Sequence, residues 1–280
     1  QLASLNPARY FGLEGLGGIG PGYFANLLVV DDLRQFKLSE VYFRGRLVAS
    51  GGKACFSTRQ TEIPWVNRTF RVKPYGPERL GYMDGGGATC PVIEVVTGQI
   101  VTRWSKAVPR RVNGLIQADP SRDLLKLAVI ERHKATGNIG VALVKGFGLK
   151  RGAIGTSVAH DSHNIVAVGA SDEDIYAVAK EIELNQGGLA CAAGGRITAS
   201  LKLPIAGLLS PEPLETVVSR IEELGRAARE LGCTLQSPFS ALSFMSLAVV
   251  PDLKLTDQGL VDVAAGRLLA AEHCRPPARG

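Results

Sequence analysis

The stretch Val129–Ile175, "VIERHKATGNIGVALVKGFGLKRGAIGTSVAHDSHNIVAVGASDEDI", decides the fold. It contains near-continuous apolar runs that are separated by glycine-rich or polar breaks. Short apolar runs rich in β-branched residues, bounded by such breaks, predict buried strands. Ser171, followed by three acidic residues at 172–174, then predicts the start of a helix, because these side chains favour the free amides of a helix N-terminus.

The same alternation continues on both sides of this stretch. A strand is predicted over 124–131, and a hairpin with its turn at Gly194–Gly195 follows the first helix. A second helix is predicted to start at Ser210 and to stop at Gly232. Its apolar face is expected to comprise Leu214, Val217, Val218, Ile221, Leu224, Ala228 and Leu231. Strands, helices and hairpins in this order predict an α/β fold, a layered α/β sandwich rather than a barrel.

The chain before this region divides by composition. Residues 1–17 have the pattern of a helix end and a loop, and residues 18–55 that of a small β-sandwich element with hairpins. Residues 56–105 are irregular, rich in Pro and Gly, and end in β-like sequence. The α/β domain is predicted over 106–280. Gly85–Gly87 lacks the Lys-Ser/Thr pair of a phosphate loop, so a turn is expected there.

Composition limits the possible partners. The net charge is +6, but the basic residues are dispersed, and only 6% of residues are aromatic. Neither observation favours a nucleic-acid surface. No run of about 18 apolar residues is present, so we expect no membrane span. The 5 cysteines are scattered and the N-terminus lacks a signal-peptide pattern, so a reducing, cytoplasmic location is expected.

The sequence "AHDSHN" at 159–164 places two of the 4 histidines of the chain in a polar break between apolar strands. In a regular strand, His160, Ser162 and Asn164 would share one face, and Asp161 and His163 the other. In a turn, all five side chains can converge on one side. Rigid flanking strands would then hold an acid/base group in place. The alternative is a polar turn whose Asp and Asn satisfy nearby backbone groups.

The cluster alone is weak evidence for a catalytic zinc site, which usually takes three protein ligands plus water. His133 follows the strand predicted over 124–131, and it would join the cluster if the two strands are neighbours; otherwise it is a solvent-exposed strand end. The remaining histidine, His273, lies near the C-terminus. The H-x-E with P-C-x-x-C, G-x-S-x-G and G-x-G-x-x-G patterns are all absent. None of these motifs therefore defines a catalytic site in this chain.

Long segments resemble the carboxy-terminal region of bacterial adenine deaminases, which belong to the amidohydrolase superfamily. They include the central stretch at 129–175, "LPIAGLLSPEP" at 203–213 and "PFSALSFMSLAVVPDLKLTDQGLVDV" at 238–263. The start, "LNPARYFGL" at 5–13 followed by "GGIGPGYFANLLVVDDL", is similar to the end of an amidohydrolase barrel and the return into its small β domain. The resemblance covers essentially the whole chain. It departs at Asn26, where amidohydrolases commonly have Asp.

The resemblance implies a metal-dependent hydrolase of purine salvage that converts adenine to hypoxanthine and ammonia. Its divalent metal, manganese or iron and possibly zinc, would be bound by a (β/α)8 barrel whose His-x-His motif is absent from this chain. The chain is therefore expected to be the carboxy-terminal lid of a longer enzyme. Residues 1–17 would end the barrel, and the barrel itself would be a partner on the same or a separate polypeptide. A homo-oligomer is also expected, and the chain alone is expected to be inactive and to provide no metal ligands.

On this interpretation the polar cluster faces the barrel mouth. His160, Asp161 and His163 are the candidate catalytic residues, with a histidine as proton carrier and Asp161 orienting it. Ser162 and Asn164, together with His133, are the candidate substrate-binding residues. The alternative function is a non-catalytic module that acts as a scaffold, mediates dimerisation or binds a ligand.

Overall fold

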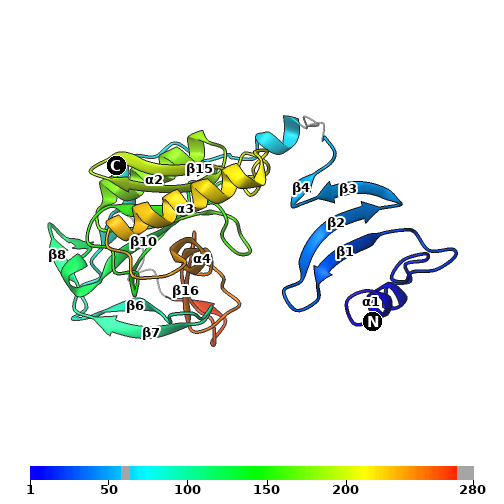
Figure 1. Ribbon diagram of the computed structural model, residues 1–280. Coiled ribbons are helices and arrows are strands. Elements are labelled where there is room, and N and C mark those ends of the chain that lie inside the picture. The colour runs from blue at the N-terminus through cyan, green and yellow to red at the C-terminus, as the bar shows by residue number, and fades with distance from the viewer. Residues whose placement is uncertain (58–63, 270–280) are drawn as a thin grey trace. The chain divides into compact units, whose positions relative to one another are not determined.

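The chain folds into two units, residues 1–62 and 63–280. The computed structural model describes residues 1–57 and 64–269 (Figure 1). The first unit contains one short helix and a four-stranded sheet in the order β1-β2-β3-β4. Its elements are α1 (Leu5–Tyr10), β1 (Leu27–Asp32), β2 (Lys37–Phe43), β3 (Arg46–Ser50) and β4 (Lys53–Ala54). Among the hairpins predicted over 18–55, the one formed by β2 and β3 is present, with its turn at Arg44 and Gly45.

The second unit is built on an eight-stranded sheet in the order β15-β14-β12-β13-β10-β11-β6-β7. All neighbours are antiparallel except β11 and β6, which run parallel. The segment 56–105 contributes β6 and the first part of β7 to this sheet. The bounds are β6 (Cys90–Val95), β7 (Thr102–Ala107), β10 (Leu125–Ile130), β11 (Ile139–Lys145), β12 (Ala153–Thr156), β13 (Ile165–Gly169), β14 (Gly188–Ala193) and β15 (Arg196–Lys202).

Both faces of this sheet are buried. Alternate side chains of β10 belong to two hydrophobic clusters, because successive residues of a strand point to opposite faces. On one face lies α2 (Asp172–Leu184), which buries Ile175, Val178, Ala179 and Ile182. On the other face lie α3 (Leu214–Glu230) and the short α4 (Pro238–Ser243) (Figure 1). The α/β class expected from the sequence is confirmed.

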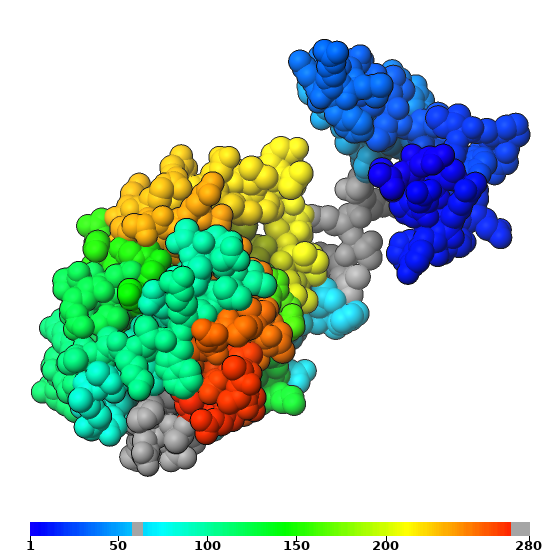
Figure 2. Space-filling view, turned by 90° about the horizontal axis from the view of Figure 1, so that it is seen from below, coloured from blue at the N-terminus to red at the C-terminus, as the bar shows by residue number. Residues whose placement is uncertain are grey.

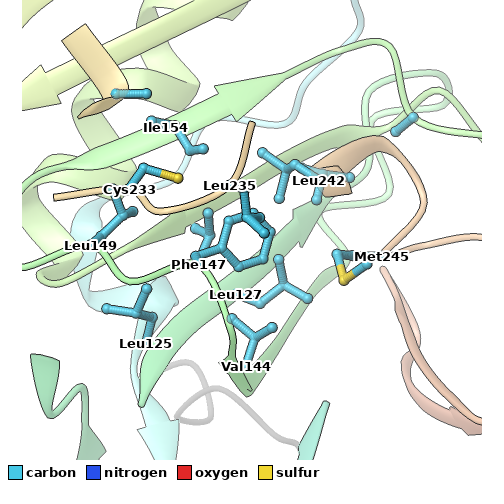
Figure 3. Close-up of a cluster of buried hydrophobic side chains, with 14 of the residues drawn as sticks. Leu125, Leu127, Val144, Phe147, Leu149, Ile154, Cys233, Leu235, Leu242 and Met245 are labelled. Carbon is cyan, nitrogen blue, oxygen red and sulfur yellow. The ribbon is translucent and has the colours of Figure 1, made fainter. Parts of the chain in front are cut away.

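Phe147 lies at the centre of the α3 side of the core. Its ring is fully buried, and side chains from the sheet and from the segment after α3 surround it (Figure 3). These neighbours include Leu127, Leu235, Leu242 and Met245. Burying a side chain of this size contributes roughly 1.5–3 kcal/mol. The buried Phe147 ring thus holds the loop that follows β11 against the hydrophobic core.

Two small three-stranded sheets complete the described part of this unit. One, in the order β16-β17-β18, packs against β6 and β7 (Figure 2). The Thr102 hydroxyl donates to the Leu253 carbonyl at 2.8 Å. The other has the order β5-β9-β8. Their bounds are β16 (Leu253–Thr256), β17 (Gly259–Asp262), β18 (Arg267–Leu268), β5 (Tyr82–Met83), β9 (Leu115–Gln117) and β8 (Arg110–Val112). Three 3-10 helices are η1 (Pro64–Asn67), η2 (Pro77–Leu80) and η3 (Pro120–Arg122).

The N-terminal cap of α2 is as predicted, but the predicted start of α3 is wrong. Ser171 Oγ accepts a hydrogen bond from the Asp174 amide at 3.2 Å. In contrast, α3 begins at Leu214, and Ser210 Oγ accepts from the Glu212 amide in a turn before it. The physical reason is Pro213, because a proline disfavours the helical conformation of the residue that precedes it.

The predicted apolar face of α3 is buried only in its second half. Leu214 is 73% exposed and Ile221 is 51% exposed, whereas Leu224 and Ala228 are buried. The first turns border an open groove instead of the core. No helix among residues 1–57 and 64–269 is long and apolar enough to cross a membrane.

The glycine-rich segment 145–152 is held by a carboxylate. Asp123 accepts hydrogen bonds from the amides of Gly146 and Gly148, each at 2.8 Å. These amides are therefore satisfied inside the protein and are not a phosphate cradle.

Two buried lysines of the second unit differ in their partners. Lys126 Nζ donates to both carboxylate oxygens of Asp172, at 2.7 and 2.8 Å. Lys254 is 0% exposed, and the acceptor of its Nζ within the described residues is the Ile100 carbonyl, at 2.9 Å. Burial lowers the pKa of Lys254 to about 8, and Asp252 acts in the opposite direction.

Replacing Lys254 by Met is expected to raise the free energy of unfolding at pH 7 by about 1 kcal/mol, because it removes a buried charge that has no close counter-ion. The folded-state pKa lies below the ordinary 10.5, so the unfolded chain binds more protons between these values. Wild-type stability should thus rise with pH in that window, and the variant should lack this contribution. Urea unfolding at pH 7 and pH ~9.5 measures both effects.

Lys126→Met is the matched comparison, since it removes an equally buried ammonium but leaves the Asp172 carboxylate without its partner. It should lower stability by about 1–3 kcal/mol. Equal losses of stability in the two variants would contradict the distinction drawn between the two lysines.

Candidate functional site

Residues 157–164, here called the site loop, connect β12 to β13 at one end of the large sheet. The two strands are paired up to Thr156 and Val166. On the other side of β13, Ile130 pairs with Ile165, so the chain leaving β10 emerges beside the site loop. His133 Nε2 consequently lies 2.7 Å from the Ser162 carbonyl oxygen. The prediction that His133 would meet the cluster if the strands are neighbours is confirmed.

His160 lies at the boundary between the site loop and an adjacent groove. Its amide donates to the Ser243 carbonyl at 2.9 Å, and its ring lies 4.8 Å from the Phe244 ring, centroid to centroid. The groove has a volume of about 700 Å³, and it is lined mainly by leucine, isoleucine and valine side chains from the segment 203–209 and from α3, with Leu189 of β14 and Leu201 of β15. The His160 ring therefore packs against Phe244 and also borders the groove.

His163 is half-buried, and its ring centroid lies 6.1 Å from that of His160. Its pKa is lowered from the ordinary 6.5, first by burial and then by the positive charge of Arg132 and by His160, with Asp161 acting in the opposite direction. Among the described residues nothing hydrogen-bonds its buried Nδ1. This imidazole is therefore neutral at neutral pH and has an unused ring nitrogen.

The other candidates separate into exposed and buried groups. Asp161, Ser162 and His133 are exposed. Asn164 is only 4% exposed, and its side chain is used inside the protein. Its Oδ1 accepts from the Arg132 amide at 3.4 Å, and its Nδ2 donates to Asp257 at 3.3 Å. Asn164 thus ties the end of the site loop to its surroundings.

Sequence reasoning missed two residues of this site. Asp257 lies in the turn between β16 and β17. One of its carboxylate oxygens accepts a hydrogen bond from the Asn164 side chain, and the other accepts one from the Asn138 side chain at 3.1 Å. Arg132, at the end of β10, is 2% exposed and donates through Nε to the His163 carbonyl. A charged residue directly after a buried strand was the only signal for Arg132. Asp257 gave no signal, because it lies 93 residues from Asn164.

The described residues do not form a metal site. In residues 1–57 and 64–269 no three His, Cys, Asp or Glu side chains are placed so that they could hold a metal ion. A catalytic zinc usually takes three protein ligands, and the two histidines and one exposed carboxylate of the site loop are not placed so that they could supply them. His273 lies outside the described residues.

The arrangement can transfer a proton and donate or accept hydrogen bonds. A neutral imidazole at His163 can accept a proton, and the exposed Asp161 and Ser162 offer a carboxylate and a hydroxyl to solvent. A polar turn would have used its Asp to satisfy local amides. Among the described residues, the Asp161 carboxylate accepts no such bond, whereas both the oxygen and the nitrogen of the Asn164 side chain are hydrogen-bonded.

Comparison with known proteins identifies the family. A family model described as "Adenine deaminase C-terminal domain" matches residues 99–267. An adenine deaminase of Dehalococcoides mccartyi is 49% identical over 97% of this chain and 48% of its own length. Adenine deaminases of Oleidesulfovibrio alaskensis and Methanothrix thermoacetophila are 44% and 43% identical, each over 94% of this chain and 45% and 46% of their own lengths.

The chain belongs to the adenine deaminase C-terminal domain family, as the matched sequence model shows. The resemblance found in the sequence is thereby confirmed. The chain spans about half the length of the curated relatives it matches.

Asn164→Ala is expected to lower the free energy of unfolding by about 1–3 kcal/mol, because it leaves the buried Arg132 amide and one oxygen of Asp257 without a partner. Asn138→Ala is the matched control. It removes the other amide donor of Asp257 from an exposed position, and it should cost about 0.5 kcal/mol or less. Denaturant unfolding of both variants measures the difference, and equal effects would contradict the anchoring role of Asn164.

Proposed function

We propose that this chain is the carboxy-terminal part of an adenine deaminase, which hydrolyses adenine to hypoxanthine and ammonia. The observation that carries the proposal is the family match over residues 99–267, together with relatives that are named adenine deaminase and are about twice as long. In this role the site loop lies at the mouth of a catalytic site whose other wall belongs to the remaining half of the enzyme. The exposure of Asp161 and Ser162 supports that placement.

We assign roles to the residues of the site loop and to His133 from their burial, exposure and charged neighbours. His163 is neutral near pH 7 and is the proton acceptor, because burial and Arg132 disfavour its charged form. His160 is a second proton carrier at the edge of the groove, and Asp161 orients or stabilises a protonated imidazole. Ser162 and His133, both exposed, contact the purine. Asn164, first expected to bind the base, keeps the loop in place through its bonds to Arg132 and Asp257.

The metal belongs to the half of the enzyme outside this chain. A divalent ion, manganese or iron and possibly zinc, on an amidohydrolase barrel would supply the activated water. The described residues do not fit a metal, so we assign no step of metal chemistry to them. We further propose that residues 1–17 end the barrel, that 18–55 belong to a composite β domain, and that the enzyme is a homo-oligomer.

A cytoplasmic place in purine salvage fits the state of the cysteines. Cys90, Cys191 and Cys233 are buried free thiols, and Cys55 is an exposed one. Free thiols of this kind are typical of a reducing compartment.

The competing function is a non-catalytic scaffold or ligand-binding module. The groove beside His160 favours it, because the exposed Leu209, Leu214 and Ile221 on its rim form an apolar surface. A chimeric enzyme distinguishes the two functions. This chain would replace the corresponding part of the Dehalococcoides mccartyi adenine deaminase, to which it is 49% identical.

The chimera should release ammonia from adenine, whereas the chain alone should not. In the chimera, His163→Ala is expected to lower kcat/KM by about 10²–10⁴-fold, the usual contribution of a positioned acid/base group. His160→Ala should also lower kcat/KM. An active chimera that is indifferent to both substitutions would leave the scaffold function as the correct one. As a control, Asn138→Ala changes an exposed residue outside the site loop and should leave kcat/KM unchanged.

A further inference from the structure

We infer that Arg132 is a positioning residue, whose buried guanidinium fixes the main chain of the site loop at His163 and places a permanent positive charge behind that imidazole. The inference rests on the proposed function and deepens it, since it concerns how the same loop is held and tuned. Nothing in the family match assigns a role to this arginine.

The guanidinium joins three segments that are far apart in sequence. Its Nε donates to the His163 carbonyl, its Nη2 to the Ala206 carbonyl at 3.2 Å, and its Nη1 to Thr69 Oγ1 at 3.4 Å. Only the planar fork of an arginine offers donors in three directions at once, whereas a lysine presents a single point charge. Arg132 thus holds the site loop against the segments around 69 and 206.

The space around the guanidinium is shaped to receive it. The Phe70 ring lies under it, with Arg132 Cζ 4.3 Å from the ring centroid. Gly207 passes on another side with a φ of +76°, where an added Cβ would lie 2.7 Å from the Phe70 ring and 3.0 Å from Arg132 Cζ. The Gly207 carbonyl in turn accepts from Ser157 Oγ at 2.6 Å, so the start of the site loop is tied to the same place.

The charge of Arg132 is not neutralised by a salt bridge. Within the described residues no carboxylate lies within 4.0 Å of its guanidinium. The neighbouring Glu131 turns instead to its own loop, where it accepts from the amides of Lys134 and Thr136 at 2.7 and 3.0 Å. Burial lowers the pKa of Arg132 to about 10, so the group stays charged at neutral pH.

The groups that face His163 from every side are Arg132, His160, His133 and Asp161. Three of them oppose its protonation and only Asp161 favours it, and burial opposes it most strongly. Because Arg132 stays charged at neutral pH, it adds to the effect of burial in disfavouring the protonated form of His163. The sequence alone does not indicate this effect of Arg132 on the protonation of His163.

Two variants separate the effect of the Arg132 charge from the effect of its three hydrogen bonds. Arg132→Gln removes the charge, so the pKa of His163 should rise toward 6.5. Arg132→Lys keeps the charge but loses two of the three anchors. The pKa of His163 should then stay low, while amide hydrogen exchange of residues 160–164 becomes at least about tenfold faster. NMR titration of the His163 ring and exchange measurements on the 280-residue chain report the two properties separately.

Arg79→Gln is the matched control, because Arg79 is a half-buried arginine that also donates to a main-chain carbonyl, that of Gly137 at 3.0 Å. It should change neither property. If Arg132→Gln does not fold, Arg132→Lys still decides the test. Unchanged exchange in a folded Arg132→Lys variant, or an unchanged His163 titration in a folded Arg132→Gln variant, would overturn the inference.

The pH dependence of the free energy of unfolding provides an independent test of the electrostatic role of Arg132. The folded-state pKa of His163 lies below that of the unfolded chain, so its contribution to stability is fully present above pH 6.5 and is lost as pH falls below that value. Arg132→Gln should weaken this acid-side loss relative to wild type, as measured by urea unfolding between pH ~7 and ~5. A variant with the wild-type pH dependence would contradict the electrostatic role.

Activity in the chimera distinguishes the inference from the proposed function. If both hold, Arg132→Lys lowers kcat/KM and leaves the acid limb of its pH profile in place, and Arg132→Gln moves that limb to higher pH. If the His163 titration and the amide exchange change as expected but kcat/KM of the chimera does not change, the positioning role stands and the proposed function fails. If the loop measurements disagree, the inference fails whatever the activity shows.

Discussion

Burial of both faces of the eight-stranded sheet is the constraint on which the rest of the larger unit depends. Strands β10, β12 and β13 are buried along their whole lengths, so polar groups can emerge only where these strands end. The antiparallel pairing of β13 with both neighbours brings two of these ends together. The helices on either face then exclude water from the sheet but leave its ends open. The topology therefore gathers exposed polar groups, those of the candidate site, at this end of the sheet.

What could be predicted was mostly local. Ser171 and the acidic residues after it fixed the start of α2, because a helix cap is formed by residues adjacent in sequence. The start of α3 failed for an equally local reason, since Pro213 outweighs the capping tendency of Ser210. The exposure of Leu214 could not be predicted, because periodicity identifies an apolar face but not what covers it.

The site itself was predictable only in part. The polar interruption between two apolar runs was visible, and the proximity of His133 followed once the strands were assumed to be neighbours. The sequence could not distinguish Asn164 from Asp161, although one is buried and bonded while the other faces solvent. Arg132 and Asp257 act through contacts between segments that are separated by 31 to 93 residues. Such contacts depend on the packed fold and leave no spacing pattern in the chain.

The hydrogen bonds that shape the site loop are directed largely at its main chain. Arg132 binds the His163 carbonyl, His133 lies against the Ser162 carbonyl, and the His160 amide binds the Ser243 carbonyl. The conformation of the loop is therefore largely independent of the side chains at Asp161 and His163. A scaffold of this kind lets evolution or an engineer exchange the reactive groups one at a time and test new chemistry without first redesigning the backbone.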